Sequence, residues 1–134
     1  MATLTPTLTL ASTDISASET LNLTLTDALT VDGPVITKRM AIDSSSTDVG
    51  ADNTIFANTD YTISYVLLYN TSSAGSGEII TIGTAAADAA LTAENMSLKP
   101  GEFAFFPWDS SVDLCADASS GAPVIEARIY QSAS

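Results

Sequence analysis

Strict alternation of apolar and polar residues is the feature that most constrains this chain. Leucine alternates with threonine or asparagine in Thr7-Leu8-Thr9-Leu10 and again over residues 21–26. A period of two places successive side chains on opposite faces of a β-strand, whereas an amphipathic helix needs a period near 3.6. The pattern therefore predicts half-buried strands. Pro6 cannot donate to a strand ladder, so residues 1–12 are expected to be an edge strand or an N-terminal arm.

Three further segments have the same periodicity. Residues 35–42 alternate, but Lys38 falls on their apolar side, which is typical of an edge strand that discourages unwanted pairing. Residues 61–69 are apolar on both faces in their second half, which favours a central strand or a subunit interface. Residues 124–130 should place Ile125, Ala127 and Ile129 inward, with Glu126 and Arg128 outside.

The connections are predicted from turn chemistry. Residues 70–77 are rich in serine and glycine, so residues 78–83 are expected to return as the hairpin partner of the preceding strand. The alanine-rich residues 84–95 fit a helical turn or a loop equally well. Lys99-Pro100-Gly101-Glu102 is typical of a type II turn, with proline and glycine at its two central positions. Taken together, about eight short strands predict one all-β domain over residues 1–134, an antiparallel β-sandwich or jelly roll.

Charge excludes some classes of partner. Four basic residues stand against sixteen acidic ones, which gives a formal charge of −12. A chain this acidic is repelled by nucleic-acid phosphates and by anionic membranes. No apolar run approaches the roughly 20 residues of a membrane span, and no secretory leader is visible at the N-terminus. We therefore expect neither nucleic-acid nor membrane binding, and synthesis in the cytoplasm.

Residue types argue against most catalytic chemistry. The chain contains no histidine and a single cysteine, Cys115, so a serine or cysteine nucleophile would lack its usual base. A glycosidase needs only two carboxyl groups, but with sixteen available no pair stands out. We expect a protein that is not an enzyme and that needs no cofactor, with a glycosidase as the least favoured possibility.

One polar loop, residues 43–53, is a weak calcium candidate. Its oxygen-bearing residues are Asp43, Asp48, Asp52 and Asn53. Calcium prefers clustered oxygen ligands, but this spacing does not match an EF-hand. A solvated acidic loop without metal is the favoured interpretation.

Residues 98–108, Leu-Lys-Pro-Gly-Glu-Phe-Ala-Phe-Phe-Pro-Trp, carry a resemblance. The segment resembles an L-x-P-G-E-x-x-x-x-P motif in small virion proteins of tailed bacteriophages, many from marine and cyanobacterial hosts. The opening Leu/Thr alternation, the strand from Tyr65 to Asn70 and the closing strand 124–130 are similar to segments of the same proteins. The resemblance is spread over most of the chain, in short motifs.

The resemblance implies a capsid decoration or cement protein on the virion surface, made in the host cytoplasm. Such a protein binds the major capsid protein or another virion protein, usually as a homotrimer. An alternative is a glycan-binding module of a fibre or tail. From apolar and aromatic character, the candidate partner contacts are Leu4, Leu8, Leu10, Tyr61, Tyr65, Phe106 and Trp108.

Overall fold

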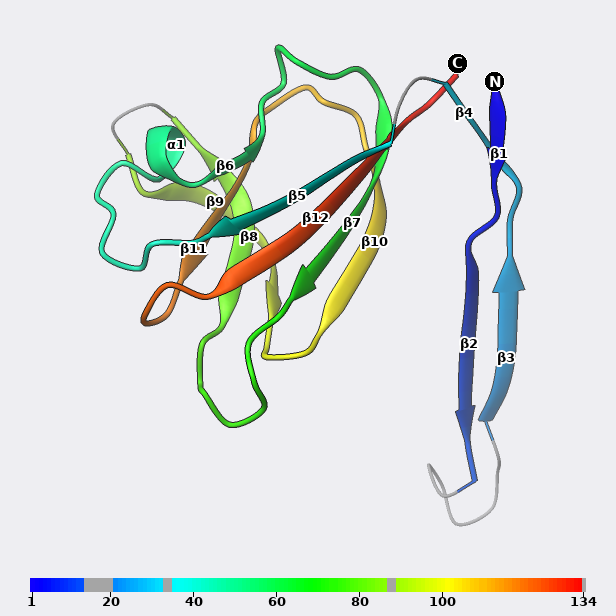
Figure 1. Ribbon diagram of the computed structural model, residues 1–134, viewed down its shortest axis with the longest axis horizontal. Helices are drawn as coiled ribbons and strands as arrows, with labels where there is room; N and C mark the ends of the chain where they lie inside the picture. Colours follow the sequence, from blue (N-terminus) through cyan, green and yellow to red (C-terminus); the bar gives the residue numbers. More distant parts are fainter. Residues whose placement is uncertain (14–20, 33–34, 87–88, 134) are drawn as a thin grey trace.

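The computed structural model is built almost entirely from antiparallel strands, in two groups (Figure 1). It describes residues 1–13, 21–32, 35–86 and 89–133. One short helix, α1 (Val49–Asp52), interrupts the strands. The larger group is a sandwich of β5 (Ile36–Ala41), β6 (Thr54–Phe56), β7 (Ser64–Asn70), β8 (Ile80–Ala85), β9 (Leu91–Leu98), β10 (Phe103–Trp108), β11 (Leu114–Ala118) and β12 (Val124–Gln131). The other group is β1 (Ala2–Leu4), β2 (Thr7–Ser12), β3 (Leu21–Thr26) and β4 (Leu29–Val31).

The sandwich strands pair in a nested order. β5 pairs with β12, β6 with β11, β7 with β10 and β8 with β9, so the first strand meets the last and the middle two meet each other. The result is two four-stranded sheets, β10-β7-β12-β5 and β6-β11-β8-β9. This is the topology of an eight-stranded jelly roll. The predicted all-β sandwich is confirmed, and its eight strands are joined by four more outside it.

The core lies between the two sheets, and alternation explains how it forms. Val66 and Leu68 of β7 and Ile125 of β12 are fully buried and face Ile80 and Ile82 of β8 across the sandwich. In β12, Ala127 and Ile129 are buried as well, as predicted. The residues between these positions, such as Leu67, Thr81 and Glu126, point outward.

The structure confirms three local predictions: an edge strand, an internal strand and a turn. β5 is an edge strand, and its inward Lys38 donates from Nζ to the carbonyl oxygen of Ile55 at 2.9 Å. β7 is internal, between β10 and β12. Between β9 and β10, the Glu102 N–H donates to the Lys99 carbonyl at 3.0 Å and Gly101 has φ +81°, as a type II turn requires.

Two predicted connections are wrong. Residues 78–83 do not return beside β7, because the loop passes from one sheet to the other and β8 joins the opposite sheet. The helical turn or loop expected over residues 84–95 is replaced in its second half by β9, which pairs with β8. Alanine is uncommon in strands and threonine is common in them, so these residues give conflicting signals and the pairing with β8 decides the conformation.

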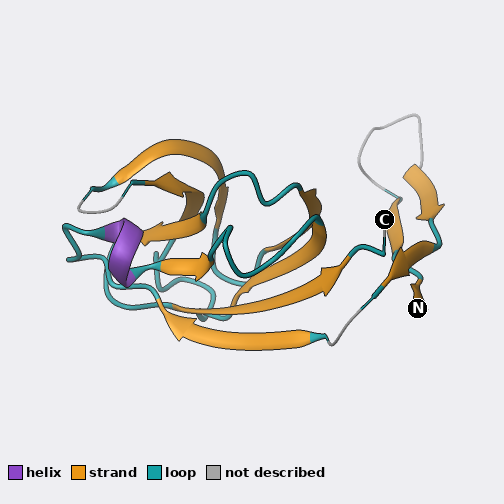
Figure 2. Cartoon of the chain, turned by 90° about the horizontal axis from the view of Figure 1, so that it is seen from above, coloured by secondary structure: helices purple, strands orange, loops and turns teal. Residues whose placement is uncertain are grey.

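The remaining four strands form a projecting arm, residues 2–12 and 21–31. β2 pairs with β3, and β1 with β4, in one narrow antiparallel ribbon. The ribbon stands apart from the sandwich in both views (Figures 1 and 2). The arm thus includes residues 21–31 as well as the predicted 1–12, and the two Leu/Thr segments are partners of each other.

Candidate functional site

One face of the arm carries leucine and the other carries threonine. Leu8 pairs with Leu25 and Leu10 pairs with Leu23, so the four side chains share one face. On the opposite face, Thr7 and Thr26 are linked through their hydroxyl groups at 3.2 Å. All four leucines are exposed, which is unusual for a contiguous apolar set.

The outer face of β7 and β10 is also apolar. Tyr65, Leu67 and Tyr69 point outward from β7, since their neighbours in the strand are buried. Phe103, Phe105 and Pro107 point outward from β10 and lie opposite them in the register. The rings of Tyr65 and Phe105 are stacked with centroids 6.4 Å apart. We call the six outward residues of these two strands the aromatic face.

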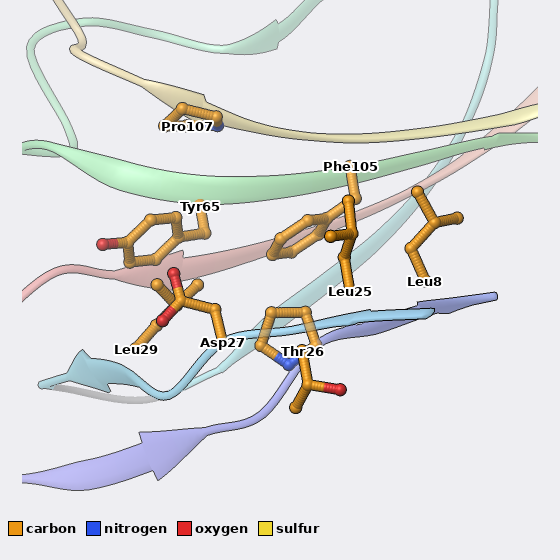
Figure 3. A pocket seen from close by; sticks show the side chains of 9 residues that line it. Leu8, Leu25, Thr26, Asp27, Leu29, Tyr65, Phe105 and Pro107 are labelled. Atoms are coloured by element: carbon orange, nitrogen blue, oxygen red, sulfur yellow. The ribbon is translucent and has the colours of Figure 1, made fainter. Parts of the chain in front are cut away.

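A groove of about 460 Å³ separates the arm from the aromatic face. Leu8 and Leu25 point from the arm toward Phe105, and Leu29 lies near Tyr65 (Figure 3). Asp27 is the one acidic residue in the lining, and its carboxylate accepts from the Ala28 N–H at 2.7 Å. The groove therefore offers apolar contact and little for acid–base chemistry.

Backbone bonds fix the root of the arm. The Asp32 N–H donates to the Gln131 carbonyl at 2.8 Å, and the Ala133 N–H donates to the Thr30 carbonyl at 3.1 Å. Val31 also forms a bridge with Ser132. The end of β4 is thereby tied to the chain that follows β12, which holds the arm beside the sandwich.

Charge is distributed unevenly over the sheets. β5, β7, β10 and β12 together carry three basic residues, Lys38, Arg39 and Arg128, and one acidic residue, Glu126. Glu126 accepts from both arginines at 3.2 Å on the outer face. In a chain of charge −12, this sheet is the one with a net positive charge, and the arm strands β1 to β4 carry no charged residue at all.

The candidate calcium residues do not converge. Asp43 accepts from the Ser45 N–H and hydroxyl at 2.8 and 2.7 Å, and Asp52 accepts from the Ser46 hydroxyl at 2.8 Å. Asp48 accepts from the Ala51 N–H at the start of α1. Within the described ranges, no three acidic, cysteine or histidine residues are grouped as metal ligands.

Asn53, the fourth candidate, is used structurally. It is buried, its Nδ2 donates to the Asp43 carbonyl at 3.0 Å and its Oδ1 accepts from the Asp43 N–H at 3.2 Å. Both polar ends of the amide are therefore occupied by the chain itself.

The predicted partner contacts divide into two groups. Leu8 and Tyr65 line the groove, Leu10 continues the leucine face, and Leu4 is half-buried in β1 opposite Leu29. Trp108 is buried instead, with its ring 6.4 Å from those of Phe56 and Tyr61, and Phe106 packs against the same core. The structure corrects the list at Trp108, which belongs to the chain's own core, whereas Tyr61 and Phe106 are partly buried and pack against that core.

Five further residues of the two apolar faces were not predicted from the sequence: Leu23, Leu25, Tyr69, Phe103 and Phe105. The leucines could have been found, because residues 21–26 repeat the pattern of residues 7–10. The phenylalanines could not, since Phe105 and Phe106 are adjacent and alternation does not say which one faces outward.

Comparison with known proteins identified no related protein. The chain matches no protein family, no curated protein and no solved structure. In the part of the chain that the structure describes, no helix is long and apolar enough to cross a lipid bilayer. The class of the protein is therefore given by its architecture: a jelly-roll domain with a projecting β-arm.

Proposed function

We propose that this chain is a non-enzymatic structural protein of a tailed-phage virion, a capsid decoration or cement protein that binds the major-capsid lattice as an oligomer. The observation that supports it most is the arm, a ribbon whose strands carry no charged residue and whose leucine face its own chain leaves exposed. An extended arm of this kind can add to the surface of a neighbouring subunit. Jelly rolls recur in viral capsid proteins, although a fold alone does not define a function.

The aromatic face supports the same proposal. Aromatic residues and arginine are enriched in protein interfaces, and acidic residues are depleted. The sheet that carries the aromatic face has that composition, with Arg39 and Arg128 beside it and Glu126 as its one carboxylate. The acidic remainder of the molecule would keep free copies soluble.

Quantitative mass spectrometry of purified virions of the encoding phage tests the proposal. A capsid component is expected in a fixed ratio to the major capsid protein, and added protein should raise the temperature at which capsids lacking it open. Absence of the chain from virions, or no binding to such capsids, contradicts the proposed function.

A glycan-binding module of a fibre or tail is the second candidate, and a specific observation favours it. Phe103 and Tyr69 are paired across β10 and β7 with exposed rings, and Glu126 lies opposite Tyr69 on β12. Exposed aromatic rings can stack on sugar rings, and a neighbouring carboxylate can accept hydrogen bonds from the sugar hydroxyl groups. Titration with host polysaccharide should then shift the aromatic NMR signals, and Phe103→Ala should abolish the shift. Unchanged spectra would exclude this candidate.

A further inference from the structure

The arm and the aromatic face together expose as much apolar surface as a stable interface needs. Leu8, Leu10, Leu23, Leu25, Tyr69, Phe103 and Phe105 are each between 38% and 62% exposed. Side chains of this size, about half exposed, present roughly 500–600 Å² of apolar surface. A standard interface buries roughly 800 Å² per partner, of which about 60% is apolar, so the two amounts agree.

The arm needs a cover that its own chain does not supply. A two-stranded ribbon is at best marginally stable in water without a hydrophobic face packed on another element. The bonds from Asp32 to Gln131 and from Ala133 to Thr30 hold the root of the arm beside the sandwich. In the structure a groove of about 460 Å³ remains open between the arm and its own sheet.

Charge indicates where copies of this molecule can meet. With a net charge of −12, two copies repel each other over most of their surface. The strands that form the groove, β2, β3, β7 and β10, contain no charged residue. The adjoining β5 and β12 are net positive, which attracts the acidic remainder of another copy.

We propose that a second copy of this chain covers the groove, with the leucine face of its arm packed on the aromatic face of the first. The inference deepens the proposed function by naming the surface through which copies associate. It concerns the purified protein in solution, so its test is separate from capsid binding.

The first test is the mass of the protein by sedimentation at micromolar concentration. The wild type should be oligomeric, and Leu10→Ser with Leu23→Ser should raise the dissociation constant at least about 100-fold, since two large apolar side chains leave the interface. Val112→Ser removes a similarly exposed apolar side chain outside the groove and should leave the mass unchanged. An unchanged thermal transition would show that the sandwich of this variant is folded.

The second test locates the contact by disulfide formation between two variants. When mixed with an added thiol oxidant, Leu10→Cys from one preparation and Phe103→Cys from another should form a mixed disulfide, because Cys115 is fully buried and each chain then has one accessible thiol. Thr9→Cys, on the threonine face, should not react with Phe103→Cys.

The outcomes separate the two proposals. A monomeric wild type overturns the inference, whether the groove is closed by its own arm or filled only by a capsid protein. An oligomer that survives Leu10→Ser with Leu23→Ser overturns it as well. An oligomer that depends on the arm but never binds capsids supports the inference and contradicts the virion role alone.

Discussion

A buried asparagine side chain bonds to backbone groups at the point where the chain passes from one sheet to the other. Asn70, at the end of β7, is fully buried; its Nδ2 donates to the carbonyls of Glu78 at 2.8 Å and Leu98 at 3.0 Å. Its Oδ1 accepts from the Ser72 N–H at 3.1 Å. One side chain thus joins the end of one sheet to the neighbouring ends of the other.

Removing that amide should be costly. Asn70→Ala removes all three hydrogen bonds that this amide makes, so we expect the free energy of unfolding to fall by about 2–4 kcal/mol. Asn58→Ala is the control, because the exposed Asn58 side chain makes one long bond of 3.4 Å to Ser111 and should change stability by less than about 0.5 kcal/mol. Urea denaturation measures both, and equal effects would contradict the assigned role.

Two exposed carboxyl groups should titrate abnormally. The Ser45 hydroxyl, with the Ser45 N–H, lowers the pKa of Asp43 below 3.8, and the Ser111 N–H and hydroxyl lower the pKa of Asp109 in the same way. Because these pKa values are lower in the folded state, the stability they contribute is present above 3.8 and is lost as the pH falls through the folded values. Ser45→Ala should raise the pKa of Asp43 in a carboxyl NMR titration and leave that of Asp109 unchanged.

At the scale of the elements, a glycine sets the distance between β8 and β9. The register shifts between Ile82 and Gly83, and a Cβ at Gly83 would overlap the carbonyl oxygen of Ala93. Glycine in a strand commonly marks such a close approach of another backbone.

Alanine at that position should separate the two strands. We expect Gly83→Ala to lower the free energy of unfolding by about 3 kcal/mol, because backbone atoms must move. Gly101→Ala is the comparison: its φ is +81° and its surroundings are open, so only the backbone conformation is penalised, by about 1 kcal/mol. Thermal or urea unfolding that ranks Gly101→Ala as the worse variant would contradict this assignment.

Sequence reasoning predicted strands better than connections. Alternation located β3, β5 and β12 within a residue or so of their ends, and Lys38 indicated an edge. It placed residues 78–83 in the wrong sheet, because a serine/glycine loop is compatible with either a hairpin or a crossover. The choice depends on which buried faces meet across the core, and a local pattern does not contain that information.

At the scale of the molecule, the arm is separate from the core. The residues of the core cluster all lie between Ile42 and Ile129, so none belongs to the arm. Deleting residues 1–31 should leave a sandwich that unfolds cooperatively, with its midpoint lowered by about 5 °C or less. Loss of the cooperative transition in a calorimetric scan would mean that the arm is part of the folding unit.

The candidate site was only partly predictable for the same reason. Leu8, Leu10 and Tyr65 were identified by apolar or aromatic character at strand positions. Trp108 was predicted on the same grounds but lies in the core, because its large apolar ring fills space between the two sheets. Which apolar residues stay outside depends on how the arm leaves the sandwich, which is a property of the whole chain.

The nested pairing of the jelly roll has a kinetic consequence. Ile80 pairs with the nearby Leu98 in β8 and β9, whereas Ala41 pairs with the distant Val124 in β5 and β12. Closing the outer pair first would enclose a long disordered loop, so we expect β8–β9 to form early and folding to take milliseconds to seconds. In stopped-flow experiments, Ile82→Val should then slow folding, and Ile125→Val should mainly speed unfolding. The opposite pattern would mean that β5 and β12 pair before β8 and β9. A chain emerging from the ribosome would thus expose its arm well before β12 arrives to complete the sandwich.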